Sequence, residues 1–285
     1  MLKYYFLLIS ISHGAIAHYF CDFPCGKEHT VCKRDPCYVS KACGANASSL
    51  GLDDEGRQWI LDLHNNYRNN IALGKDTTGG NGQASNMLAL NYDRELEFVA
   101  QCWSNACAET GNSHDTCRTT KKFRYVGQNM YSSGSSVSID FSDKKFLTNA
   151  VEAWYSEIKM SNGGEIDSYK DSSGSIGHFT QVVWAETSHV GCGRTFYMSQ
   201  NNFFSVYIYC NYGSGGNVVG TPVYRRGQPC SNCGRRKCNS KYTGLCGAVN
   251  KLSSDDWDSP FRMAGSRLQT SIYTTLILII TLLFL

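Results

Sequence analysis

Apolar residues recur at every third or fourth position in three stretches of the chain. Two of these stretches follow an aspartate, Asp53 or Asp93, and the third begins near Asp143. This period is typical of an α-helix with one buried face, and aspartate is a favoured N-cap residue. We therefore predict three amphipathic helices, the first of which ends at Gly74. The side chains expected to face inward are Trp59, Ile60, Leu63, Tyr67 and Ile71 in the first helix, Leu96, Val99, Ala100, Trp103 and Cys107 in the second, and Phe146, Ala150, Val151, Trp154 and Ile158 in the third.

Two later runs, residues 190–198 and 203–212, are rich in β-branched and aromatic residues. The polar residues 199–202 join them, which predicts an antiparallel hairpin that Cys192 and Cys210 could staple. A further short strand is predicted within residues 125–132.

Three glycine-, serine- or threonine-rich segments are expected to be loops: residues 75–85, 132–138 and 162–177. Helices interspersed with strands between them indicate a mixed α/β domain over residues 53–225, with helices packed on a sheet.

The chain contains 14 cysteines, an even and high number that indicates an oxidising compartment and a disulfide framework. Five of them lie in a predicted N-terminal extension, residues 18–52, and four lie in a predicted tail module, residues 226–250. Cys230 and Cys233 have a C-x-x-C spacing, but no histidine follows. A two-disulfide knot of undetermined pairing is therefore favoured over a zinc site.

Both ends of the chain match targeting signals. Residues 1–17 have the basic, apolar and small-residue pattern of a signal peptide. Residues 272–285 are almost purely apolar but shorter than the roughly 20 residues of a membrane-spanning helix. Together with the polar linker 251–271 they match a GPI-attachment signal, with a short tail anchor as the alternative. Membrane contact is thus expected through the C-terminal anchor.

Charge and sequons add two expectations. The net charge of +3 and the absence of a long lysine or arginine run argue against nucleic acid as a partner. Asn46, in an Asn-Ala-Ser sequon, is a candidate glycosylation site on an exposed loop.

His178 lies between a flexible glycine and the apolar run 182–184, so it is expected at the edge of the core, facing a cleft. A lone histidine in such a place is more often structural, and His64, within the first helix, is interpreted as structural. Glu157 lies three residues after Trp154 on nearly the same helical face. Ser175 and Thr180 are the nearby hydroxyls, but no nucleophile motif surrounds them.

Several motifs together identify a resemblance. Residues 177–184 (GHFTQVVW) resemble the first signature of the CAP superfamily, which includes cysteine-rich secretory proteins and venom allergens. Residues 207–218 resemble the second signature, except that Gly215 stands where proline is common, so a looser turn is expected. Residues 111–129 and the run from His29 to Cys32 are similar to the arthropod antigen-five branch.

The resemblance implies a three-layer α-β-α sandwich whose central cleft is lined by His114, Gln128, Glu157 and His178. Gln128 replaces a glutamate that is common in the family, which removes one carboxylate. It also implies the disulfides Cys21–Cys32, Cys25–Cys117, Cys43–Cys107 and Cys192–Cys210, which leaves Cys37–Cys102 as a hypothesis.

Two imidazoles and one carboxylate are suited to a divalent cation, and the missing carboxylate predicts weak binding of zinc or magnesium by His114 and His178. No cofactor is expected to be required. The favoured function is an extracellular, non-catalytic binding module for a lipid, a sterol or a protein. The alternatives are a metal-dependent hydrolase or protease, and an inhibitor or toxin-like effector of a host protein.

Overall fold

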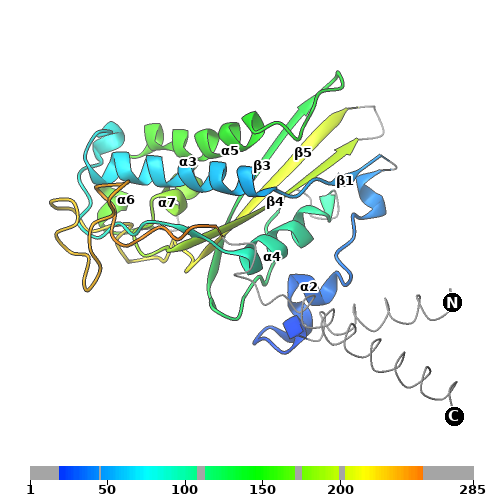
Figure 1. Ribbon diagram of the computed structural model, residues 1–285, viewed down its shortest axis with the longest axis horizontal. Helices are drawn as coiled ribbons and strands as arrows, with labels where there is room; N and C mark the ends of the chain where they lie inside the picture. Colours follow the sequence, from blue (N-terminus) through cyan, green and yellow to red (C-terminus); the bar gives the residue numbers. More distant parts are fainter. Residues whose placement is uncertain (1–18, 45, 108–112, 171–174, 199–202, 253–285) are drawn as a thin grey trace, which may run out of the picture.

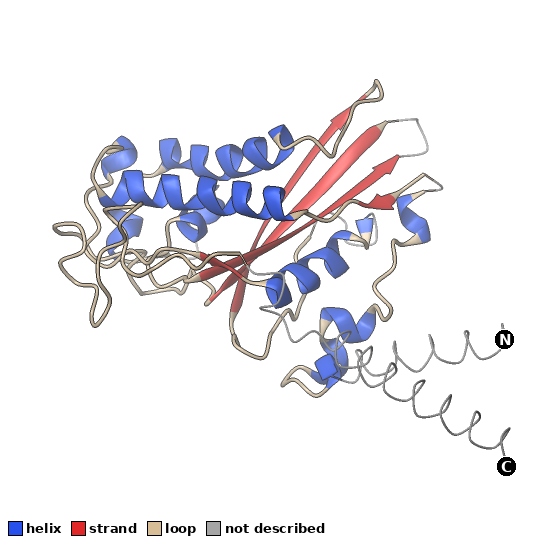
Figure 2. Cartoon of the chain, in the orientation of Figure 1, coloured by secondary structure: helices blue, strands red, loops and turns tan. Residues whose placement is uncertain are grey.

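A central sheet carries helices on both of its faces (Figures 1 and 2). The computed structural model describes residues 19–44, 46–107, 113–170, 175–198 and 203–252. The strands are β1 (Ser48–Ser49), β2 (Asn91–Tyr92), β3 (Val126–Ser135), β4 (His189–Met198) and β5 (Phe204–Gly213). Their order is β1-β4-β5-β3, antiparallel throughout, with the short β2 pairing parallel to β4. The helices are η1 (Gly26–Glu28), α2 (Thr30–Lys33), η2 (Lys41–Cys43), α3 (Asp54–Ala72), η3 (Thr78–Gly80), α4 (Arg94–Ser104), α5 (Lys145–Ser156), η5 (Glu157–Met160), α6 (Gly164–Asp167) and α7 (Gly177–Val182).

The helices form two layers, as the sandwich prediction requires. α3, α5 and α7 bury their apolar side chains with one face of β4 and β5 in the main core. α4 packs on the other face, where Ala100 meets Tyr207 and Tyr209. Figure 1 shows α3 and α5 side by side on one side of the sheet, and α4 on the other. The predicted α-β-α sandwich is confirmed.

Two glycines in β4 allow α4 to lie almost directly on the strand. A Cβ at Gly191 would come within 2.3 Å of the backbone of Asp93 and Glu97, and one at Gly193 within 2.3 Å of Gln101. Real Cβ atoms do not approach other atoms so closely, because van der Waals repulsion rises steeply. The Gly-x-Gly pattern therefore sets the spacing between sheet and helix.

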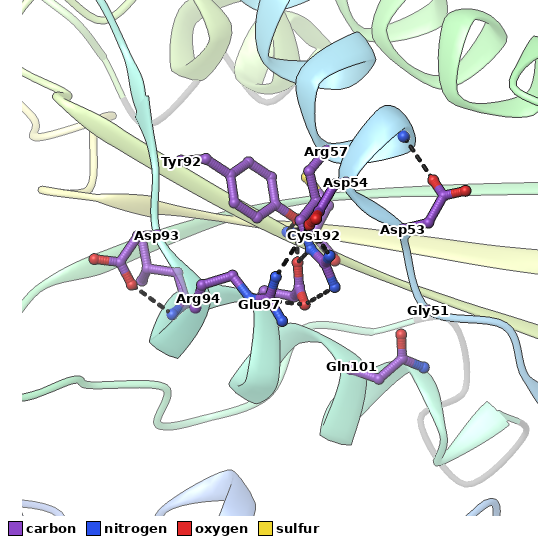
Figure 3. A network of polar contacts seen from close by, with 12 residues as sticks. Gly51, Asp53, Asp54, Arg57, Tyr92, Asp93, Arg94, Glu97, Gln101 and Cys192 are labelled. Atoms are coloured by element: carbon purple, nitrogen blue, oxygen red, sulfur yellow. Dashed lines mark hydrogen bonds and ion pairs between the residues drawn. The ribbon is translucent and has the colours of Figure 1, made fainter. Parts of the chain in front are cut away.

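A salt bridge joins the two helical layers beyond the sheet (Figure 3). Arg57 of α3 donates to both carboxylate oxygens of Glu97 of α4, at 2.6 and 2.9 Å. The Tyr92 hydroxyl donates to the same carboxylate at 2.6 Å and accepts from the Cys192 amide at 3.2 Å. The bidentate geometry fixes orientation as well as distance.

Arg68 is fully buried in α3, and all of its hydrogen-bond partners among the described residues are backbone carbonyls. Its guanidinium donates to the carbonyl oxygens of Leu88, Val182, Trp184, Ala185 and Thr187. Burial lowers its pKa to about 9. The side chain thereby connects α3 to the end of α7 and the segment that follows it. The sequence did not indicate this role, because an arginine is usually expected at the surface.

The three predicted helices and the hairpin are confirmed, with N-cap bonds from Asp53 to the amide of Gly56 and from Asp93 to that of Leu96. Some details were wrong. Trp59 was expected inside but is 44% exposed, because its indole bonds to Thr148 at the surface. Cys107 lies beyond the end of α4 in a left-handed turn.

Three loop expectations also need correction. β3 continues to Ser135, because all ten of its residues pair with β5. The segment 162–177 contains the short helix α6. The turn at Gly215 is not loose: its amide donates to the Tyr125 carbonyl at 2.9 Å, and a Cβ there would lie 2.6 Å from the Gly127 nitrogen.

The disulfides link the extension to the sandwich and close the tail module. Cys25, Cys37 and Cys43 of the extension pair with cysteines of the α/β domain. The bonds are Cys21–Cys32, Cys25–Cys117, Cys37–Cys102, Cys43–Cys107, Cys192–Cys210, Cys230–Cys238 and Cys233–Cys246. These include every pair that the sequence resemblance implied, and the tail holds two disulfides.

The expected signal peptide, residues 1–17, and the apolar tail, residues 272–285, lie outside the described residues, as does the linker 251–271 beyond Leu252. Asn46 is exposed. Within the described part of the chain, none of the helices has the length and apolar character to span a bilayer.

Candidate functional site

His178 is held by Glu157, a residue 21 positions earlier in the chain. The ring Nδ1 donates to Glu157 Oε1 at 2.6 Å. Because the carboxylate is an acceptor, this contact places the proton on Nδ1. Nε2 of His178 is left without a hydrogen-bond partner among the residues that the structure describes.

Glu157 also caps the helix that carries His178. Its Oε2 accepts from the backbone amides of His178 at 2.9 Å and Phe179 at 3.1 Å, in the first turn of α7. A carboxylate at a helix N-terminus satisfies amides that have no partner within the helix. It can do so because α5 ends at Ser156 and a 3₁₀ turn redirects the chain. The sequence placed Glu157 on the helical face of Trp154, but it did not predict that Glu157 caps α7.

His114 is positioned by the N-terminal extension. The disulfide Cys25–Cys117 and a bond from the Thr30 amide to the Cys117 carbonyl (2.9 Å) tie its segment to α2. The Asp115 carboxylate accepts from the hydroxyl of Thr30 and from the guanidinium of Arg118. The extension therefore contributes directly to the candidate site.

A directed chain of hydrogen bonds leads inward from His114. Its Nδ1 lies 2.8 Å from Gln128 Oε1, Gln128 Nε2 donates to Asn211 Oδ1 at 2.9 Å, and Asn211 Nδ2 donates to the Leu96 carbonyl. Each amide thus accepts on one side and donates on the other. Glutamine suits this position, because a carboxylate could not donate to Asn211.

Two neighbouring residues of the edge strand β3 contact the two histidines. Side chains alternate between the faces of a strand, so neighbouring residues point in opposite directions. Gln128 binds His114 on the α4 side, while Asn129 donates to the His178 carbonyl at 3.1 Å on the α7 side. The predicted residues therefore form two hydrogen-bonded pairs, His114–Gln128 and Glu157–His178, around one strand.

The two pairs interact electrostatically. Partial burial lowers the pKa of His114 below its ordinary value. The hydrogen bond to Gln128 opposes this shift, whereas electrostatic interaction with Arg118 and His178 lowers the pKa further. His114 nevertheless remains accessible to solvent.

His64 belongs to the core, as its position in the sequence indicated. It is fully buried; Nδ1 donates to the Ile60 carbonyl at 2.7 Å, so Nε2 accepts from the Tyr212 hydroxyl at 2.9 Å. The same hydroxyl is 3.3 Å from Asn129 Nδ2. A chain of hydrogen bonds thus leads from His64 to the backbone of His178.

Neither hydroxyl near His178 is placed as a nucleophile. The Thr180 hydroxyl is buried, donates to the Ile176 carbonyl or to Asn217 Oδ1, and lies within 3.2 Å of three oxygens. Ser175 is exposed, and among the described residues no hydrogen bond joins it to His178.

Each histidine of the site offers one ring nitrogen of the kind that zinc binds. A histidine whose Nδ1 donates to a carboxylate or amide oxygen has the tautomer that offers Nε2 to a metal. His178 and His114 both have such a partner, in Glu157 and Gln128. The sulfurs of Cys230, Cys233 and Cys246 also lie close together, but disulfides occupy them.

Comparisons with known proteins agree on one family. Residues 61–212 match the model of the CAP, cysteine-rich secretory protein, family. The chain is 34% identical to a venom allergen 3 homolog of Dinoponera quadriceps, over 79% of this chain and 97% of that protein. It is 34% identical to venom allergen 5 of Tityus serrulatus, over 82% of this chain but only 56% of that protein.

Among solved structures, that of NaASP2 with Zn²⁺ is 31% identical, with a TM-score of 0.56 over 69% of this chain and 97% of that one.

Proposed function

Because the chain belongs to the CAP family of cysteine-rich secretory proteins, we propose that it is a non-catalytic binding module whose cleft holds a divalent cation weakly. As an extracellular CAP protein, it would act outside the cell. The proposal rests on one observation: His114 and His178 each have Nδ1 engaged by an acceptor from another segment. The Nε2 atoms of these rings would be the ligands.

The arrangement supports binding more than catalysis. Glu157 already accepts three hydrogen bonds, so it orients His178 rather than serving as a free base. Thr180 is engaged in the core. A bound cation would supply positive charge to the site, and the fixed imidazoles would set its position. The structure of NaASP2 with Zn²⁺ supports zinc as the ion to test.

Isothermal titration calorimetry of the full chain with ZnCl₂ tests the proposal. We expect a dissociation constant weaker than about 1 μM, because only two neutral nitrogen ligands and no free carboxylate are available. Binding should be lost in His114→Ala and in His178→Ala. His189→Gln, which changes a histidine bonded to Lys122 outside the site, is the matched control. Submicromolar affinity, or binding that survives both alanine variants, would contradict the proposal.

The partner is proposed to be a lipid, a sterol or an extracellular protein. Native mass spectrometry separates these classes, because co-purified lipid would identify a carrier and an unliganded mass would favour a protein partner.

Anchoring through residues 272–285 stays a proposal, tested by phospholipase release of the protein from expressing cells. The division of the chain into an extension (18–52), a CAP domain (53–225) and a tail module (226–250) is also a proposal.

A further inference from the structure

Positive charge is concentrated in the tail module and the residues on either side of it. The chain has 27 lysines and arginines, of which seven lie in residues 225–251. None of the 24 aspartates and glutamates of the chain lies in these residues. The net charge of +3 for the whole chain hides this asymmetry, because acidic residues elsewhere offset it. A local excess of one sign creates a field that attracts the opposite charge.

The tail module and the first half of α3 enclose an open pocket of about 630 Å³. Arg236, Lys237, Lys241 and Lys251 line it, and Asp62 is the one carboxylate among its described lining residues. The volume is within the range of small-molecule sites, roughly 300–1,000 Å³. In Figure 1 this segment (orange) runs beside α3, at the opposite end of the molecule from α2.

The negative charge of Asp62 is already matched. Its Oδ1 accepts from Lys241 Nζ at 3.0 Å, from the Tyr242 hydroxyl at 2.6 Å and from Gln58 Nε2 at 2.9 Å. No ion pair joins Arg236, Lys237 or Lys251 to a carboxylate of the described residues. Within the part of the chain that the structure describes, the pocket thus keeps three cations without a carboxylate partner.

The backbone that carries these cations is held in place. The disulfides Cys230–Cys238 and Cys233–Cys246 close the module, and the Gly247 amide donates to the Lys237 carbonyl at 2.8 Å. Arg236 extends over Gly247, where a Cβ would lie 3.3 Å from its Cδ. A fixed arrangement lowers the entropic cost of binding an anion.

We propose that this pocket binds the sulfate groups of an extracellular sulfated glycosaminoglycan. Like charges held around one pocket repel each other, and an anion relieves that repulsion. The CAP family is extracellular, where sulfated polysaccharides present many anionic groups on one chain. Arg225 and Arg235, both exposed, extend the basic surface beyond the pocket, as a long polyanion requires.

The test is surface plasmon resonance of the full chain on immobilised heparin at 0.15 M NaCl. The triple variant Arg236→Gln, Lys237→Gln, Lys251→Gln should bind at least tenfold more weakly. The control Lys27→Gln, Lys41→Gln, Lys170→Gln removes the same charge from exposed sites outside the module and should change affinity less than twofold. Wild-type affinity should fall steeply with salt, because binding releases counterions.

Three outcomes would overturn the proposal. Equal losses in the two triple variants would indicate net charge alone rather than this pocket. Undiminished binding to fully desulfated heparin would exclude sulfate as the recognised group. Tighter binding to phosphatidylserine vesicles than to heparin, lost in the pocket variant, would assign the pocket to a membrane. His114→Ala, which tests the zinc site, should leave heparin binding unchanged, so the two proposals can fail separately.

Discussion

Two histidines joined by one chain of hydrogen bonds have opposite environments. His64 is fully buried, and both of its ring nitrogens have partners inside the protein. His178 keeps about a third of its side chain exposed, and only Nδ1 is engaged. Asn129 links them, since its amide contacts both the Tyr212 hydroxyl and the His178 carbonyl.

The difference separates a histidine that serves the core from one with a ring nitrogen available to a ligand. A histidine with both nitrogens satisfied has no capacity left for a ligand, and its removal leaves buried partners unpaired. A histidine with one nitrogen fixed and the other directed outward has a defined orientation and a free ligand atom. The number of engaged nitrogens therefore separates the two roles.

The largest difference between the two histidines is expected in stability, when each is replaced by alanine. His64→Ala removes a buried ring and leaves the Tyr212 hydroxyl without its acceptor, so we expect a loss of about 3 kcal/mol in the free energy of unfolding. His178→Ala removes a partly exposed ring and should cost less than about 1 kcal/mol. Urea unfolding at pH 7 measures both. Similar losses in the two variants would show that the distinction is wrong.

The second largest effect is expected at acidic pH, where the neutral, buried His64 should lower the stability of the fold. Burial lowers the pKa of His64 from 6.5 to about 4. As the pH falls from about 6.5 to about 4, the unfolded chain takes up the proton while the folded state keeps the ring neutral, so stability is lost in that window. At pH 4.5 the loss from His64 should be about 2 kcal/mol.

Urea unfolding at pH 7.0 and pH 4.5 tests this for the wild type and His64→Gln. The variant should lose less stability between the two pH values. His189, whose pKa burial and Lys122 also lower to about 4, remains in both proteins and supplies a common background. An equal loss in wild type and variant would mean that His64 does not titrate as proposed.

The sequence predicted the helices, the hairpin and the structural role of His64, because local patterns determine them. Aspartate N-caps and apolar periods mark α3 and α4, and β-branched residues mark β4 and β5. The resemblance implied which residues line the site, but not their hydrogen bonds, since Glu157 caps α7 across 21 residues and Gln128 contacts Asn211 across 83. Arg68 was missed because its acceptors are backbone carbonyls, which no side-chain pattern reveals.

The charge of the tail pocket was missed for another reason. Its cations are the adjacent Arg236 and Lys237, together with Lys241 and Lys251, which follow after neutral residues, so the four form no long run in the sequence. The two disulfides gather them around one pocket. Composition averaged over the chain cannot detect such a local excess.

Gln128→Glu gives the smallest expected effect and tests the binding half of the comparison. A carboxylate beside His114 would strengthen cation binding about tenfold, or about 1.4 kcal/mol, by adding negative charge to the site. It would also face Asn211 Oδ1, which now accepts from Gln128 at 2.9 Å, so stability should fall by about 1 kcal/mol. Gln128→Met is the matched control, because it breaks the same hydrogen-bond chain without adding charge. It should lose stability and gain no zinc affinity in calorimetry. If Gln128→Glu binds zinc no more tightly than the methionine variant, His114 does not share its space with the cation, and only His178 would remain as a candidate ligand.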